Sequence, residues 1–207
     1  LTGRFAEGYP DIVRRIGRVS HFELGNHSHS HPDLTGKPAE SVAEEILHTQ
    51  RAIHRISGRR GRLFRPPYGR TNSTVNDVAA RYGLHTVLWD VAADDYRKDV
   101  SGAQVAKSVL AGVRNGSIVL LHMHGDGSAA CEALPEIIAG LRGRGFELVK
   151  VSTLIEDRIK KNGHYTGCPL YIKRKWSMDQ YGGHVAGRIS CRSAPYGGLN
   201  RVMPNRQ

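Results

Sequence analysis

Two histidines four residues apart, His27 and His31, have the types and spacing that most directly suggest chemistry in this sequence. Side chains at positions i and i+4 lie on one side of a helical turn or a tight loop, so both imidazoles can reach one point. Imidazole nitrogens are common ligands of zinc and related ions. His29, between them, is expected to point the other way. The alternative for an isolated motif of this kind is a solvated, histidine-rich surface turn.

Four further polar residues lie at or after the C-terminal end of an apolar segment that is expected to be a strand: Arg65, Tyr68, Asp95 and His122. In parallel βα architectures the loops after the strands converge on one rim, so these side chains could meet the histidine pair. Taken singly, Arg65 could be a structural ion-pair partner, Asp95 a turn residue and His122 a buried imidazole. The hypothesis of a common site therefore depends on their joint placement.

An alternation of strands and helices would position these residues. Apolar residues recur every three to four positions in the expected helices, which are 5–16, 38–57, 73–82, 101–113, a long helix through 134–141 and a short one near Leu154. Short apolar runs indicate strands at 22–24, 63–65, 86–91, 118–121 and 146–149. Within the first helix, Ile12, Val13 and Ile16 are expected to face inward. The βα repeat predicts an α/β fold with a parallel sheet or barrel and helices outside.

Length and composition favour one folded domain. A chain of 207 residues with 39% hydrophobic residues can build one sizeable core. No apolar run approaches the length of a membrane span, and residues 1–4 carry neither an initiator Met nor a signal-peptide pattern, so we expect a fragment of a longer protein. The three cysteines are an odd number without metal-site spacing, so no disulfide framework is indicated.

The positive charge is concentrated at the C-terminal end. Residues 157–207 contain ten Lys or Arg and two Asp, and so hold eight of the eleven net positive charges. A basic nucleic-acid surface would be expected to run through the folded part, so we predict no nucleic-acid partner. Because apolar periodicity also ends near residue 160, we expect a folded domain at 1–156 and a basic, irregular, poorly ordered tail at 157–207.

Together, the polar motifs resemble those of the polysaccharide deacetylases, family four of the carbohydrate esterases. The resemblance covers about residues 1–156 and keeps the family's motif order. His27-Ser-His-Ser-His31 resembles the family's His-Ser/Thr-x-x-His motif, Arg65-Pro66-Pro67-Tyr68 resembles Arg-x-Pro-Tyr, Asp95-Tyr96 stands where the family has Asp-Trp, and Leu120-Leu121-His122 resembles Leu-x-His.

The resemblance implies a distorted (β/α) barrel and a metal-dependent hydrolase that removes acetyl groups from N- or O-acetylated polysaccharides such as chitin or peptidoglycan. His27 and His31 would bind a divalent metal, with zinc expected. The implied catalytic roles are general acid for His122, orientation or charge stabilisation of that acid for Asp95, an oxyanion contact from the backbone amide of Tyr68, and pairing with the catalytic carboxylate for Arg65. The implied substrate-binding residues are Trp89 and Leu120, which would wall the acetyl pocket, with Pro67 and Tyr96.

One departure from the family pattern stands out. The family's first motif, Thr-Phe-Asp-Asp-Gly-Pro, supplies the general base and the third metal ligand, and no Asp-Asp-Gly-Pro occurs in this sequence. We therefore expect the first βα unit of the barrel to be missing from this chain. Lesser departures are Tyr96 in place of Trp, and Met123-His124 where an acidic residue is usual.

Two functions fit this pattern. The first is a polysaccharide deacetylase, and the second is a non-catalytic carbohydrate-binding relative that lacks the general base. Arg65 and His122 have little purpose in a protein that only binds, so they favour the enzyme. A polymeric substrate implies a secreted or cell-surface location, and the sequence leaves the oligomeric state open.

Overall fold

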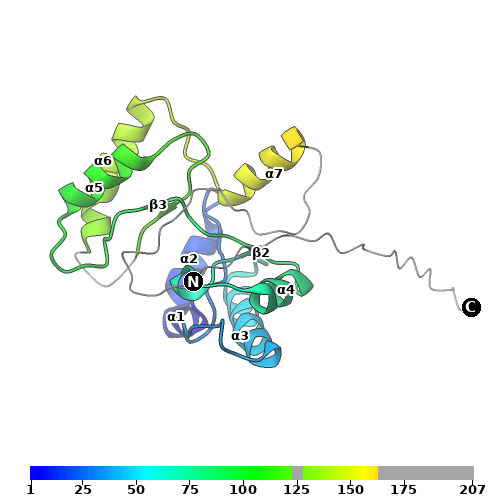
Figure 1. Ribbon diagram of the computed structural model, residues 1–207. Helices are drawn as coiled ribbons and strands as arrows, with labels where there is room; N and C mark the ends of the chain where they lie inside the picture. Colours follow the sequence, from blue (N-terminus) through cyan, green and yellow to red (C-terminus); the bar gives the residue numbers. More distant parts are fainter. Residues whose placement is uncertain (123–127, 163–207) are drawn as a thin grey trace, which may run out of the picture. The chain divides into compact units, whose positions relative to one another are not determined.

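The computed structural model describes residues 1–122 and 128–162 of the chain (Figure 1). In this part the helices are α1 (Gly3–Gly8), α2 (Pro10–Arg18), α3 (Ala39–Ser57), α4 (Ser73–Arg81), α5 (Gly102–Gly112), α6 (Ala129–Gly143) and α7 (Val151–Asn162), with a 3-10 turn, η1 (Pro67–Gly69). The strands are β1 (Leu63–Phe64), β2 (His85–Thr86), β3 (Val91–Ala92) and β4 (Val119–Leu120).

The strands pair in parallel, as the sequence predicts. β1 pairs with β2, with Leu63 opposite His85, and β3 pairs with β4, with Val91 opposite Val119. A helix separates the two strands of each pair, α4 in the first and α5 in the second. Parallel neighbours require such a crossover connection, which confirms the βα repeat and the α/β class.

Buried apolar side chains form four clusters. One packs α3 and α4 around Phe64 of β1, another packs α5 against α6, and a third joins α1 and α2 to α3. The fourth brings together Leu63, Val87, Ile118 and Ile155. This last cluster connects β1 with the segments beside β2 and β4 and with α7, so the loops that carry the polar motifs start from packed positions.

The long helices follow the predicted pattern. In α3 the predicted apolar stripe is buried at Val42, Ile46 and Ile53, and Gly58 ends the helix with φ 71°. A left-handed residue at this place suits glycine, which has no Cβ to clash. Ser101, the residue before α5, forms a capping box: its side chain accepts from the backbone N–H of Gln104, and the Gln104 side chain accepts from the backbone N–H of Ser101.

The prediction of one continuous helix at 5–16 is wrong. The chain forms two helices, α1 and α2, which meet at Tyr9 with φ −130° and ψ 58°. Pro10 has no N–H to continue the first helix and disfavours helical dihedrals in the residue before it, so a new helix begins there. The break also changes the buried face: Val13 is buried, whereas Ile12, predicted to face inward, is 42% exposed.

Several predicted strands are also wrong or shorter than predicted. Segment 22–24 forms no strand, and the parallel bridge to Phe64 is made by Asn26 instead. The predicted strand 86–91 is divided between β2 and β3. Segment 146–149 pairs with no strand among the described residues, and Leu148 is 48% exposed. A short apolar run becomes a strand only where a partner offers hydrogen bonds, which the sequence alone does not reveal.

The predicted division at residue 156 falls inside α7. Residues 163–207 lie outside the described part of the chain, so the domain and tail assignments stay predictions. Among the helices that the structure describes, none has the length and apolar character needed to cross a membrane.

Candidate functional site

His27 and His31 lie together, as the motif predicts. Their Nε2 atoms are 3.2 Å apart, and their rings meet edge to face. His27 Nδ1 lies 2.6 Å from the carbonyl oxygen of Arg65. A carbonyl only accepts, so Nδ1 donates the proton and Nε2 is the unprotonated nitrogen of the neutral ring. Burial, opposed by this hydrogen bond and aided by nearby positive charges, lowers the pKa of His27 to about 4, so the ring is neutral at pH 7.

The loop that carries the pair is held by short polar contacts. Asn26 is buried and its amide group donates to the carbonyl of Ile46 on α3, while its side-chain oxygen accepts from the backbone N–H of Ser28. The hydroxyl of buried Ser28 accepts in turn from the backbone N–H of His31. These contacts fold residues 26–31 into a tight turn, which brings the two imidazoles to one side.

Glu45 of α3 fixes the middle of the same loop. Its Oε2 accepts from the backbone N–H groups of His29 and Ser30 at 2.8 Å each, and its Oε1 accepts from the Ser30 hydroxyl at 2.6 Å. Burial opposes the charge of Glu45, but the hydrogen bonds outweigh it and the pKa of Glu45 is lowered from its usual value. An ionised carboxylate therefore anchors the loop at residues 26–31, called the histidine loop below, to α3. Sequence reasoning missed Glu45, because nothing in its spacing points to the loop.

The Arg65-Pro66-Pro67-Tyr68 segment lies beside the pair. The ring of Tyr68 meets the ring of His31 edge to face at 4.8 Å between centroids, and its hydroxyl donates to the His31 carbonyl at 3.4 Å. Pro67 is buried, whereas Tyr68 is 62% exposed. Tyr68 has φ 59°, which turns the backbone sharply after the two prolines.

Arg65 is enclosed without a matching carboxylate among the described residues. Its guanidinium lies 5.7 Å from the centroid of the Trp89 ring, and its Nε is buried with no hydrogen-bond partner in the described part of the chain. Burial lowers the pKa of Arg65. An enclosed cation of this kind is costly unless a counter-charge meets it, so the position is suited to a carboxylate.

Asp95 and His122 form the second polar group. Asp95 is buried and accepts from both the backbone N–H and the Nδ1 of His122, the latter at 3.0 Å. This contact places a proton on Nδ1, so Nε2 is the nitrogen that can exchange a proton with a substrate. The His122 side chain is 33% exposed, and the ring of Tyr96 lies edge to face with it. Such a pair has the form of an oriented general acid or base.

Backbone strain marks the same segments. Among the described residues, four that are not glycine have positive φ: Ser28, His31, Tyr68 and Asp94. Side chains raise the energy of this conformation, and such residues cluster at functional sites. All four lie in or directly beside the predicted motifs, which supports a functional reading of those motifs.

The structure thus gathers the predicted residues into two groups. The first contains His27, His31, Arg65, Pro67, Tyr68 and Trp89, and the second contains Asp95, Tyr96 and His122 with Leu120 two residues before it in β4. The meeting of both groups on one rim stays a prediction, as does the acetyl pocket between Trp89 and Leu120. His29 points away from the pair as expected, and stacks on His48 of α3.

Comparison with known proteins brings these motifs into one family. A family model described as "Polysaccharide deacetylase" matches residues 1–87. The chain is 33% identical over 156 residues to the peptidoglycan-N-acetylglucosamine deacetylase PgdA of Listeria monocytogenes, covering 75% of this chain and 32% of PgdA. It is 30% identical over 161 residues to the peptidoglycan-N-acetylmuramic acid deacetylase PdaA of Bacillus subtilis, covering 76% of this chain and 60% of PdaA. The chain thus spans only part of the length of these relatives.

Solved structures are similar over most of the domain. A family 4 carbohydrate esterase from Streptomyces lividans, solved with acetate, is 35% identical with a TM-score of 0.63, covering 70% of this chain and 72% of that one. A family 4 acetyl xylan esterase from Clostridium thermocellum, solved with cobalt, is 30% identical with a TM-score of 0.70, covering 76% and 75%. BA3943, a pseudoenzyme of the same family from Bacillus anthracis, is 26% identical with a TM-score of 0.69, covering 75% and 53%. The chain belongs to the polysaccharide deacetylase family, which is family four of the carbohydrate esterases.

Proposed function

We propose that this chain carries most of the active site of a metal-dependent hydrolase that removes acetyl groups from N- or O-acetylated polysaccharides such as peptidoglycan or chitin. Family membership alone does not separate this function from that of a non-catalytic relative, because the family includes a pseudoenzyme. The observation that carries the proposal is the Asp95–His122 pair. A protein that only binds sugar has no need of a buried carboxylate that orients a half-exposed imidazole.

The residues of the histidine loop fit a divalent metal, with zinc as our choice. His27 would bind through Nε2, because its Nδ1 is engaged by the Arg65 carbonyl, and a hydrogen bond of this kind typically orients a metal-binding imidazole. His31 presents its own Nε2 at 3.2 Å from the first. When bound, the metal would polarise the acetyl carbonyl and make a water more acidic.

The chain's own groups would do the remaining work. The backbone amide of Tyr68 would donate to the oxygen that becomes negative as the acetyl carbon is attacked, and one such donor is typically worth ~3 to 4 kcal/mol. His122 would pass the proton on its Nε2 to the departing amine or alcohol. Asp95 would hold the ring in that orientation and balance the positive charge of its protonated form.

The catalytic base must come from a further carboxylate. The 207 residues contain no Asp-Asp-Gly-Pro, the motif that supplies the base and a third metal ligand in the family that the chain resembles. Catalytic zinc sites normally have three protein ligands, and the histidine loop offers two. The enclosed guanidinium of Arg65 is where we expect this carboxylate to be held.

We infer that Trp89, Leu120, Pro67 and Tyr96 shape the site for the acetyl group and the sugar. The two parallel strand pairs would then belong to one distorted barrel whose rim carries both polar groups. PgdA and PdaA are named as peptidoglycan deacetylases, so acetylated peptidoglycan is our first substrate. This substrate would place the protein outside the cytoplasm or at the cell surface.

The proposal is tested by acetate release. The protein to use is the extended chain, meaning these 207 residues joined to a preceding segment that carries Asp-Asp-Gly-Pro, with zinc present. Acetylated peptidoglycan fragments, chitooligosaccharides and acetylated xylan would be compared as substrates. We expect His122→Ala to lower the rate by ~10²- to 10⁴-fold, whereas His54→Ala, at an exposed histidine of α3, leaves it unchanged. Equal rates for both variants would refute the assigned role of His122.

A further inference from the structure

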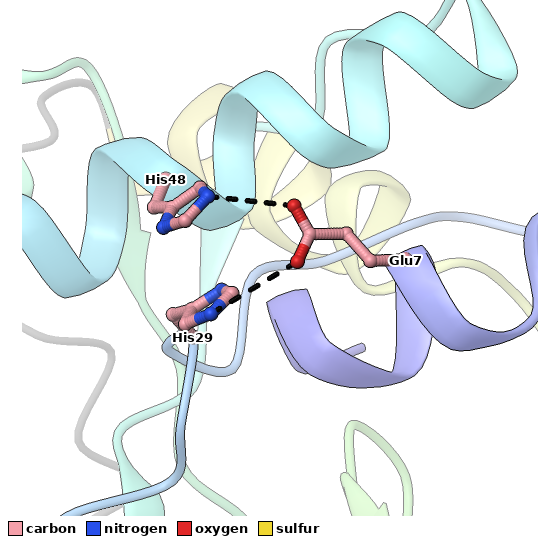
Figure 2. Close-up of side chains that lie close together, drawn as sticks. All are labelled: Glu7, His29 and His48. Atoms are coloured by element: carbon pink, nitrogen blue, oxygen red, sulfur yellow. Dashed lines mark ion pairs between the residues drawn. The ribbon is translucent and has the colours of Figure 1, made fainter.

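A second group of possible metal ligands lies where three segments of the chain meet. Glu7 comes from α1, His29 from the histidine loop and His48 from α3, and Figure 2 shows the carboxylate of Glu7 facing both imidazoles. His48 Nε2 lies 3.4 Å from one carboxylate oxygen, and His29 Nε2 lies 4.0 Å from the other. One ligand atom from each of the three residues lies within 4.8 Å of the others.

The geometry points to a divalent metal site at Glu7, His29 and His48, distinct from the pair His27 and His31, with zinc as the ion that its two imidazoles and one carboxylate suit best. Zinc binds nitrogen at ~2.0 to 2.1 Å and carboxylate oxygen at ~2.0 to 2.2 Å, so tetrahedral ligand atoms lie roughly 3.4 Å apart. The observed ligand atoms lie within 4.8 Å of one another and the two imidazoles are parallel, so the exposed side chains of Glu7 and His48 have to rotate for all three ligand atoms to reach one ion.

The two imidazoles of the proposed site lie close together. His29 and His48 are stacked with 4.0 Å between centroids and 7° between planes. Neutral imidazole is the form that binds metals. His29 Nδ1 is buried against Gly3 and has no hydrogen-bond partner among the described residues, so Nε2 is the nitrogen of His29 that can reach an ion.

The backbone around the three residues is tied together. The backbone N–H groups of Gly3 and Arg4, at the start of α1, donate to the carbonyls of Ser28 and His29. The buried cluster around Ala6 and Ala52 packs α1 onto α3. Because these contacts fix the three chain segments before any ion binds, little order has to be created on binding, which favours affinity.

A cavity borders the two imidazoles of the proposed site. A cavity of about 320 Å³ is lined by His29 and His48, together with Lys37, Ser41, Glu44 and Glu45. Water would supply the remaining position. Cationic side chains oppose the ion: Arg55 lies 3.6 Å from the same Glu7 oxygen that faces His48, and Lys37 lines the cavity. A metal would compete with this guanidinium for the carboxylate.

The site would act on the histidine loop. An ion held here would join α1 and α3 to the residue between His27 and His31, and so would stiffen the loop that presents the pair. The assignment does not depend on the proposed function, because it concerns different side chains and has a different readout.

The test is zinc titration by calorimetry on the full chain carrying His27→Ala and His31→Ala, which removes the pair. We expect this background to retain a zinc site that is weakened at least ~10-fold by adding His48→Ala or Glu7→Gln. Adding His54→Ala, at an exposed histidine on the same helix, should change nothing, and Arg55→Ala should tighten binding because the competing cation is gone. Zinc should also raise the melting temperature of the background, but not when His48→Ala is present.

His48 and Glu7 are partly exposed, so these substitutions are expected to leave the fold intact, and circular dichroism checks this. Zinc binding in the background that is unchanged by His48→Ala and by Glu7→Gln, or an absence of binding in the folded background, would overturn the assignment. Loss of acetate release on His122→Ala bears only on the proposed function, so the two proposals can fail separately.

Discussion

Replacing Glu45 would release the loop that presents the histidine pair. In Glu45→Ala, three hydrogen bonds to an ionised carboxylate are lost, two from backbone N–H groups and one from the Ser30 hydroxyl. A bond to a charged group contributes ~1.5 to 3 kcal/mol, and water can replace part of it at this half-buried position. We therefore expect the free energy of unfolding to fall by about 2 to 4 kcal/mol, and the zinc affinity of the pair to fall as well.

Glu45→Gln provides the matched comparison. Glutamine can keep one oxygen on the two backbone N–H groups, and its amide can donate to the Ser30 hydroxyl, so mainly the charge is lost. The expected loss is about 1 kcal/mol.

The contribution of Glu45 to the free energy of unfolding depends on pH with a definite sign. The pKa of Glu45 is lowered in the folded protein, so its stabilisation is present above the ordinary value of 4.5 and is lost as the pH falls through the folded pKa. Urea unfolding at pH 7 and at successively lower pH, with zinc titration at pH 7, measures these effects. A Glu45→Ala protein within about 0.5 kcal/mol of the parent at pH 7 would refute the anchoring role, since that is the ordinary range for surface substitutions.

Three further predictions follow from the same geometry. Asp95→Asn should lower acetate release by the extended chain ~10²-fold or more while leaving zinc affinity unchanged, because the asparagine amide can donate to His122 Nδ1 and so move the ring proton from Nδ1 to Nε2. An equal loss of zinc affinity would contradict this prediction. Gly69→Ala should destabilise more than Gly83→Ala in urea unfolding: both have φ near 70°, but only at Gly69 would a Cβ come within 2.7 Å of an indole. Since the pKa of His27 is lowered to about 4, the free energy of unfolding of the metal-free protein should decrease as the pH falls from about 6.5 towards 4, and His27→Gln should reduce this pH dependence. The same pH dependence in both proteins would exclude His27 as the cause.

The parts of the fold that the sequence predicted are those fixed by local rules. The stripe of α3 and its end at Gly58 follow from helix periodicity and glycine's tolerance of positive φ. Segment 146–149 has the same apolar character as the true strands, but whether it pairs depends on a distant partner. Tyr9 and Pro10 divide the first helix although the apolar spacing continues across them, because proline outweighs periodicity.

The candidate site shows the same limit. The motif spacing correctly predicted that His27 and His31 meet, and the Asp95–His122 contact agrees with the role that the resemblance implied. Nothing in the sequence linked Glu45 to the loop at 29–30, or Glu7 to His48, since those contacts arise from the packing of α1 and α3. Contacts between separate helices depend on tertiary structure, whereas a motif within one loop is readable from its spacing.

The most direct test of the account compares acetate release by the 207-residue chain and by the extended chain, with zinc and the same acetylated substrate. The account predicts that the added Asp-Asp-Gly-Pro segment raises the rate by ~10²- to 10⁴-fold, and that His122→Ala abolishes the gain. If the unextended chain releases acetate as fast as the extended chain, and this activity falls on His122→Ala, the further carboxylates are unnecessary and the proposed mechanism is wrong.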